Sequence, residues 1–503
     1  MENKLNFNLN DNGNELENFD GIDFGSVEAQ NEAFNSASGR AAGSAYASAV
    51  GVGATVHSTA PAAAGVASEN GKGGANAVAD KFEALQILKS MQSGTNPDAR
   101  IASRILAQKT HVLKSIEDEI DYVAGSGSSA VKFIKGEYGA GKTFHLRLAA
   151  AYAMSKNLAV SHIFLNKDMA MQKMNEVYAR IVKELRSREH SSFIEMLDAW
   201  IDRTAAESKK GSLMGDYGEF IVESFRVKLR PVESASASFA MALKCYITSR
   251  LNSNYEMLTA IAGWISGESN VGLAGVKRLA GVRGAIDKTN YLEFLKGLLR
   301  LMRVMGYAGT AVMIDECEKM RYISTSKSRA AAYDTVRDFV DYVSDGTLDS
   351  TMLIFAGNEE WYEDKHCGIA SYQALYDRIT NRLERKFAGN FVNSRQIMLN
   401  LKNLSSGEIT LLMKKICALY KTAYEYDPLP AVSGAENEIV SVYSNSSALT
   451  GGRVHPRSFV RSFVELLNYL EQNGSVATPG EIIDLFKNQI EKDDCGVDMF
   501  AEV

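Results

Sequence analysis

The chain is poor in cysteine, with 5 in 503 residues. The cysteines are scattered, and no two of them form a Cys-x-x-Cys pair: Cys245, Cys317, Cys367, Cys417 and Cys495. An odd, widely spaced set argues against a disulfide scaffold and is typical of reduced thiols in the cytoplasm. The 7 histidines are dispersed as well, so we predict no structural zinc site.

Long hydrophobic runs are also missing. Residues Met1–Asn12 are polar and acidic and contain no apolar core of a signal peptide. The longest stretch of low charge, residues 41–67, is mostly Ala, Gly and Ser, which are too weakly apolar for a membrane span. We therefore expect a cytoplasmic protein without a membrane partner.

Positive charge is not in excess. The net charge of -6 argues against a uniformly basic nucleic-acid coat. A net charge does not describe a local groove, however, and Lys277, Arg278 and Arg283 lie close together in one Gly-containing segment. A solvated loop and a contact to DNA phosphates are both open interpretations of this segment.

The composition divides the chain into three parts. Residues 1–78 lack the periodic bulky apolar side chains that a packed core requires, and we predict a disordered low-complexity tail. Helical periodicity begins near Ala79. We predict a main domain over 79–400, with a helical insertion at about 168–304, and a helical lid domain over 401–503.

Within the main domain, five short apolar segments predict β-strands at 130–135, 158–165, 310–314, 351–356 and 396–399. Helical segments connect them, including a long helix from about Ser371 to Arg385. This alternation predicts an α/β fold with a doubly wound, five-stranded parallel sheet that carries helices on both faces.

A glycine-rich motif follows the first predicted strand and precedes a predicted helix. It fits G-x-x-x-x-G-K-[ST] at every position: Gly136, Glu137, Tyr138, Gly139, Ala140, Gly141, Lys142 and Thr143. Glycines let successive backbone N–H groups converge on phosphate oxygens, and the helix directs its positive end at the same anion. The position between a strand and a helix favours a P-loop over a chance match. Lys142 is then expected to reach the β- and γ-phosphates of ATP, and Thr143 to bind Mg²⁺.

Two acids end the third predicted strand. Asp315 is expected to hold Mg²⁺, and Glu316 to orient and deprotonate the attacking water. Glu318 and Arg321 follow on the same loop. Acids and arginines at such positions are more often structural ion-pair formers, and a direct role for either residue stays open.

Polar residues elsewhere complete the candidate site. Asn358 follows the fourth predicted strand, at the edge where open α/β sheets bind ligands. It is expected to position the water or the γ-phosphate, and a simple turn residue is the alternative.

Transfer of a phosphoryl group also calls for a cation near the γ-phosphate, often an arginine from a neighbouring subunit. Arg378, Arg382 and Arg385 share one face of the predicted helix, with a solvated basic face as the alternative. Arg453 and Arg457 lie where the lid helix starts and are candidates for a nucleotide contact from the lid side. A purely structural role is the alternative for these two.

These motifs carry a resemblance to a known family. The segments FIKGEYGAGKTFHLRLAAAYAMSKNLAVSHIFLN, GYAGTAVMIDECEKM, LIFAGNEEWYEDKHCGIASYQALYDRI and RVHPRSFVRSFVELL resemble the ATP-binding proteins of BREX (bacteriophage exclusion) systems. The resemblance covers about Ala84 to Leu470. The Glu-Tyr pair inside the loop and the acid-rich Asp-Glu-Cys-Glu segment are its more specific features, although Cys317 stands where an aliphatic residue is expected.

The resemblance implies an AAA+-like ATPase core with a helical lid and a role in antiphage defence. It also implies partner proteins, including a DNA methyltransferase, and contact with DNA. Lys142, Thr143, Asp315 and Glu316 take the family's roles directly, and the resemblance extends to Asn358, Arg378 and Arg457.

Two other functions fit the same motifs. One is an origin-recognition-like or transposition-regulator loader of the AAA+ class. The other is a nucleotide-gated signalling scaffold that hydrolyses ATP slowly. The leading interpretation, an ATP-driven motor or switch acting on DNA within a defence complex, predicts nucleotide-dependent assembly into a homo-oligomer.

Overall fold

A computed structural model describes residues 73–95, 99–102, 104–106, 109–166, 169, 171–211, 217–268, 285–380, 395–445, 454–473 and 478–497. Most of the predicted tail lies outside these ranges. So do five of the basic residues singled out in the sequence: Lys277, Arg278, Arg283, Arg382 and Arg385. The lid residue Arg453 is also outside the described residues.

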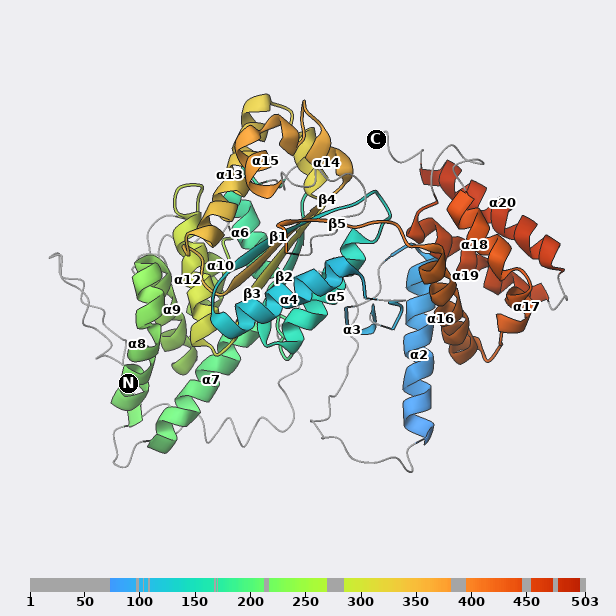
Figure 1. Ribbon diagram of the computed structural model, residues 1–503. Coiled ribbons are helices and arrows are strands. Elements are labelled where there is room, and N and C mark those ends of the chain that lie inside the picture. Colours follow the sequence, from blue (N-terminus) through green and yellow to red (C-terminus); the bar gives the residue numbers. More distant parts are fainter. Residues whose placement is uncertain are drawn as a thin grey trace.

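One parallel sheet forms the centre of the molecule (Figure 1). Its strands are β1 (Ala130–Lys135), β2 (Leu158–Phe164), β3 (Gly309–Asp315), β4 (Thr351–Gly357) and β5 (Met398–Asn400). Their spatial order is β2-β3-β4-β1-β5, and every pairing is parallel. The α/β class and the five parallel strands are therefore confirmed.

The register places the three loops that carry predicted site residues at one edge of the sheet. Lys135, which ends β1, lies beside Gly357 at the end of β4. Near the end of β3, Ile314 lies beside Phe355 of β4. Because parallel strands share their carboxyl edge, the segments that follow β1, β4 and β3 lie next to each other in that order.

Helices cover the first face of the sheet. They are α4 (His111–Ser126) and α5 (Lys142–Ser155), whose apolar residues pack on alternate residues of β1 to β4. Thr110 caps α4, because its hydroxyl accepts a hydrogen bond from the backbone N–H of Leu113. This layer holds the start of α5 directly under the carboxyl edge of β1.

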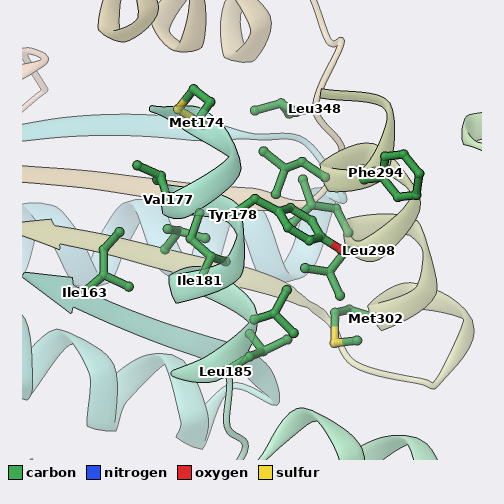
Figure 2. Close-up of a cluster of buried hydrophobic side chains, with 14 of the residues drawn as sticks. Ile163, Met174, Val177, Tyr178, Ile181, Leu185, Phe294, Leu298, Met302 and Leu348 are labelled. Atoms are coloured by element: carbon green, nitrogen blue, oxygen red, sulfur yellow. The ribbon is translucent and has the colours of Figure 1, made fainter. Parts of the chain in front are cut away.

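The second face is covered by α6 (Met174–Lys183), α12 (Tyr291–Val304) and α13 (Ser326–Ser344). Figure 2 shows part of this core, where Val177 and Ile181 of α6 lie near Ile163 of β2, and Leu298 of α12 belongs to the same cluster. Each fully buried aliphatic side chain of this kind stabilises the fold by about 1.5–3 kcal/mol. This large core fixes the position of β3, and therefore of the acids that follow it.

The predicted helical insertion extends outward from this face. It contains α6 and four longer helices, α7 (Phe193–Gly211), α8 (Tyr217–Ala235), α9 (Ala237–Leu251) and α10 (Tyr255–Ile265), before α12 returns to the sheet. Among the described helices, none is both long and apolar enough to cross a membrane.

A separate helical body lies beside the sheet (Figure 1). It consists of α16 (Ser406–Tyr424), α17 (Leu429–Ser433), α18 (Glu436–Asn445), α19 (Pro456–Asn473) and α20 (Pro479–Val497). The first helix of the described chain, α2 (Gly73–Gln92), packs into the same core through Ala84, Ile87, Leu88 and Met91. The helix predicted to begin near Ala79 thus begins at Gly73 and completes the C-terminal helical body.

Short elements precede β1 or lie between the later strands. They are α3 (Ala99–Ala102), the 3₁₀ turns η1 (Cys317–Tyr322) and η2 (Ile369–Ser371), α14 (Glu359–Glu363) and α15 (Gln373–Ile379). The prediction of one long helix from Ser371 to Arg385 was wrong, because α15 ends at Ile379 and Thr380 has an extended backbone. The predicted β5 begins two residues late, at Met398, where pairing with Phe133 of β1 starts.

The start of β3 gives a test of the sheet geometry. A Cβ atom on Gly309 would lie 2.3 Å from the backbone oxygen of Ser350, which cannot move without breaking the sheet. We expect Gly309→Ala to lower the free energy of unfolding by about 1–3 kcal/mol, as measured by urea denaturation. Gly125→Ala is the matched control, because nothing lies within 4 Å of its added Cβ in α4. Equal stability of the two variants would contradict this packing.

Candidate functional site

The glycine-rich loop connects β1 to α5 through backbone angles that only glycine adopts easily. Gly139 has φ 78° and Gly141 has φ 95°, both in the left-handed region. Gly141 is the N-cap of α5, so the helix begins at Lys142 and directs its free N–H groups at the loop. An anion is the ligand that such a cradle stabilises.

Close neighbours hold the loop from two sides. A Cβ on Gly136 would lie 3.1 Å from the backbone oxygen of Leu401, just after β5. A Cβ on Gly139 would lie 2.9 Å from Cβ of His455, just before α19 of the helical body. The loop therefore lies between the sheet and the helical body, and side chains at these two positions would push it out of place.

Lys142 is bound to its own loop. Its ammonium donates to the carbonyl oxygens of Gly136 and Glu137, both at 3.0 Å, and the side chain is 8 % exposed. Among the described residues no carboxylate forms an ion pair with it within 4.0 Å, so its hydrogen bonds go to neutral carbonyl groups. A phosphate is a stronger partner for such a cation than two carbonyl oxygens.

Thr143 and Asp315 meet across the sheet edge. The hydroxyl of Thr143 donates to Oδ2 of Asp315 at 2.7 Å, although the two residues are 172 positions apart. Asp315 is 1 % exposed, and its Oδ1 accepts from the backbone N–H of Glu316 at 2.9 Å. Burial raises the pKa of Asp315, but the nearby His162 ring and the Thr143 hydroxyl outweigh it, so the net pKa lies below its usual range. The buried carboxyl is therefore ionised.

A histidine on β2 approaches the same carboxylate. Nε2 of His162 lies 3.7 Å from Oδ2 of Asp315, which is too long for a hydrogen bond. The ring is packed against Phe164, with centroids 4.7 Å apart. No sequence pattern signals this contact, because it depends on the pairing of β2 with β3.

A second histidine, His145 of α5, holds the phosphate loop through two hydrogen bonds. Nδ1 of His145 lies 2.9 Å from the oxygen of Gly141, and Nε2 lies 2.9 Å from the hydroxyl of Thr110. A carbonyl oxygen can only accept, so Nδ1 carries the proton and Nε2 accepts from Thr110. Burial lowers the pKa of His145 below its ordinary value of 6.5. A neutral imidazole thus ties the loop to the start of α4.

The two glutamates after β3 differ sharply in environment. Glu316 has a left-handed backbone, with φ 58°, and its side chain is 36 % exposed, 3.7 Å from the ammonium of Lys319. Glu318 is only 7 % exposed. Arg321 pairs with Glu360 and, at 2.8 Å, with Asp364, and so fixes η1 to α14. For Arg321 this is the structural ion-pair role.

Asn358 and Arg378 are engaged with protein groups. Asn358 follows β4, between the loop and Asp315, and its Oδ1 caps α14 by accepting from the N–H of Trp361 at 2.9 Å. Arg378 makes a two-pronged ion pair with Asp341 of α13, at 2.7 and 3.1 Å. Both side chains thus bind protein groups in this conformation, and their roles at a nucleotide stay predictions.

The helical body contacts the loop through its first residues. The guanidinium of Arg457 lies over the ring of Tyr138, 6.0 Å from the centroid, and donates to its hydroxyl at 3.3 Å. On the other side, Oε2 of Glu137 accepts from Asn403 at 2.8 Å and lies 3.7 Å from Nδ1 of His455. The sequence predicted that Arg457 faces a nucleotide site from the lid side, and the structure places it against the phosphate loop.

Comparison with known proteins gives one match. The family described as BREX system ATP-binding protein BrxC/D has a model that matches residues 80–484, which is well over half of the chain. A search of curated proteins found no match. The matched range includes the phosphate loop, β3 with the acids that end and follow it, and most of the helical body.

The pKa of His145 predicts a pH-dependent stability. The unfolded chain binds a proton near pH 6.5, whereas the folded chain resists it, so this contribution is present above pH 6.5 and is lost as the pH falls below it. His145→Asn removes the imidazole from both states. We expect the difference in Tm between wild type and variant to shrink from pH 7.5 to pH 5.5, as measured by calorimetry.

The exposed His366 supplies the control, because His366→Asn removes an imidazole without touching the loop. A wild-type advantage over His145→Asn that stayed constant or grew on acidification would contradict the buried neutral ring.

Proposed function

The chain belongs to the BREX system ATP-binding protein BrxC/D family, and we propose that it binds ATP with Mg²⁺ between β1 and α5 and hydrolyses it during antiphage defence. The observation that carries the proposal is the hydrogen bond of 2.7 Å from Thr143 to Asp315. It brings together the two side chains that the sequence assigns to the metal, next to a loop built for phosphate.

The donor set fits magnesium. A hydroxyl and an ionised carboxylate are hard oxygen ligands, and Mg²⁺ usually combines one or two protein oxygens with water and substrate phosphates. Among the described residues there is no cluster of three or more His, Cys, Asp or Glu that would suit a metal held by protein alone. Bound magnesium would neutralise charge on the β- and γ-phosphates, with Thr143 and Asp315 as its protein contacts.

The other residues bind and orient the substrate. Lys142 exchanges its two carbonyl contacts for phosphate oxygens, and the N–H groups at the start of α5 bind the same phosphates. Asn358 lies between Lys142 and Asp315 in strand order and retains a free amide group for the γ-phosphate or the water, since its Oδ1 alone caps α14. A carboxylate after β3, sequence-predicted as Glu316, takes the proton of the attacking water.

We place this core in the AAA+ class. The strand order supports it, because β4 lies between the strand of the phosphate loop and the strand that ends in Asp315. The helical body supports it too, since Arg457 touches Tyr138 inside the loop. A cation on that helix is positioned to sense whether a nucleotide occupies the loop, so the helical body acts as a lid.

Arg378 is proposed to act on a nucleotide bound by a neighbouring subunit in a homo-oligomer. Its side chain is 39 % exposed and so is accessible to a neighbouring subunit. Its ion pair with Asp341 is partly exposed and therefore weak, which makes an exchange for phosphate in a neighbour's site inexpensive.

We propose in addition that the chain acts on DNA. Its support is the family resemblance and the basic residues Lys277, Arg278 and Arg283 of the sequence. ATP would then control DNA contact by the same chain, together with other defence proteins.

The ATPase proposal is tested with Lys142→Ala. Removing a charged hydrogen-bond donor to phosphate costs about 1.5–3 kcal/mol, so we expect roughly 10- to 100-fold weaker binding of MgATP and no measurable release of phosphate. Lys156→Ala is the matched control, because Lys156 lies at the other end of α5 and pairs with Asp121. Calorimetry and a phosphate-release assay provide the measurements, and a purified wild-type chain that failed to bind MgATP would refute the proposal.

DNA contact is tested separately. Replacing Lys277, Arg278 and Arg283 by Ala should weaken binding to duplex DNA and reduce the slope of log K against log salt by roughly one unit per residue. Lys327→Ala, on the exposed start of α13, is the control. If the chain bound no DNA in any nucleotide state at low salt, the proposed action on DNA would be wrong. A nucleotide-gated scaffold would then be the remaining interpretation.

A further inference from the structure

The carboxyl group of Glu318 is buried without a full set of partners. The residue is 7 % exposed, and its Oε2 has no hydrogen-bond partner among the described residues. No ion pair within 4.0 Å joins it to a described cation. A buried carboxylate in this state is costly, because it has lost its water and gained nothing equivalent.

Its position follows from the backbone after β3. The left-handed conformation of Glu316, with φ 58° and ψ 34°, turns the chain back into η1. Cys317 is then fully buried, and its thiol donates to the oxygen of Ile314 at 3.3 Å. The turn leaves Glu316 on the outside and brings Glu318 inside.

Charged groups of the phosphate loop and of the end of β3 act on Glu318. Burial raises the pKa of Glu318 above its ordinary value, although its own backbone N–H and the Lys142 ammonium lower it, and Glu316 and Asp315 add to the rise. Burial first, and then the charges of Cys317 and Glu318, raise the pKa of the Tyr362 phenol, whose hydroxyl donates to the oxygen of Ile134 near the end of β1. Glu318 is thus a buried acid just after β3, near enough to the phosphate loop for the Lys142 charge to act on it.

A buried carboxyl group without a full set of partners fits a residue whose hydrogen-bond donor arrives with the bound substrate. A general base needs an ionisable carboxylate that is kept from bulk water and has a free lone pair facing the reacting water. Glu316 has the opposite properties, since it is partly exposed and lies near Lys319. Arg321 fixes η1 to α14 through Asp364, so Glu318 is held in place before substrate arrives.

We propose that Glu318, in place of Glu316, is the carboxylate that accepts the proton of the attacking water. The inference rests on the proposed ATP hydrolysis. The water oxygen forms a bond to the γ-phosphorus as the bond from that phosphorus to the β,γ-bridging oxygen breaks. ADP leaves with the electron pair of that bond. The water proton passes to Glu318 and then to the phosphate product, which restores the carboxylate.

The test compares three isosteric variants, Glu318→Gln, Glu316→Gln and the exposed control Glu359→Gln from α14. Binding of MgATP is measured by calorimetry, and hydrolysis by single-turnover release of phosphate. We expect Glu318→Gln to retain wild-type affinity within about threefold and to lose at least about 100-fold in the hydrolysis step, the lower end of what a general base contributes. Glu316→Gln should lose less than about tenfold, and Glu359→Gln should match the wild type.

Thermal unfolding separates catalysis from a structural role. Replacing an unpartnered buried carboxyl group by a neutral amide should leave Tm unchanged or raise it, whereas loss of a structural ion pair would lower it. If Glu318→Gln does not fold, Glu318→Asp serves instead. It keeps the charge but shortens the side chain by one methylene, and it should again bind ATP and hydrolyse it slowly.

Three outcomes would overturn the inference. The first is full hydrolysis by Glu318→Gln or by a folded Glu318→Asp. The second is an equal loss in the Glu316 and Glu318 variants. The third is a wild-type chain that binds MgATP but never hydrolyses it, which would also refute the proposed hydrolysis. The first two leave that function standing, so the two failures are distinguishable.

Discussion

The hydrogen bond between Thr143 and Asp315 is the contact on which the candidate site depends. It joins the phosphate loop after β1 to the end of β3 across β4, so β1 and β3 must end at the same edge of the sheet. Two hydrophobic layers hold the strands in this register. One layer holds α5 on the first face, and the other fixes β3 from the second face. The polar site is thus a consequence of apolar packing, which aligns groups that lie far apart in the sequence.

The loop is also the meeting point of the sheet and the helical body. Glycine at 136 allows contact with the chain after β5, and glycine at 139 allows contact with His455. Glu137 and Tyr138 then contact Asn403 and Arg457 of the C-terminal part. These contacts join the loop to the chain after β5 and to the start of α19, and the helical body that α19 belongs to shares its core with α2.

The parts of this arrangement that the sequence predicted depend on local signals. Apolar runs identified the five strands, and the spacing of glycines and Lys142 identified the loop. The sequence could not show that α2 packs into the C-terminal core, because an apolar helix face does not indicate which element it packs against. The supports from His145 and His162 were missed for a related reason: a single histidine gives no pattern, and its partners lie on other elements. The helix predicted from Ser371 to Arg385 extended too far beyond Ile379. The charged residues that follow keep a helical spacing, but such a spacing alone does not make a helix.

The two acids after β3 show most clearly why residue type alone does not assign a role. Sequence position favours Glu316, since it follows Asp315 directly. The backbone supports the proposed role of Glu318 instead, because the left-handed residue Glu316 turns the chain so that Glu316 stays partly exposed and Glu318 is buried. That conformation costs about 1–3 kcal/mol for a residue other than glycine, and burying Glu318 adds to the cost. A carboxylate proposed to act on a water beside the phosphate loop accounts for the burial, which stability alone does not.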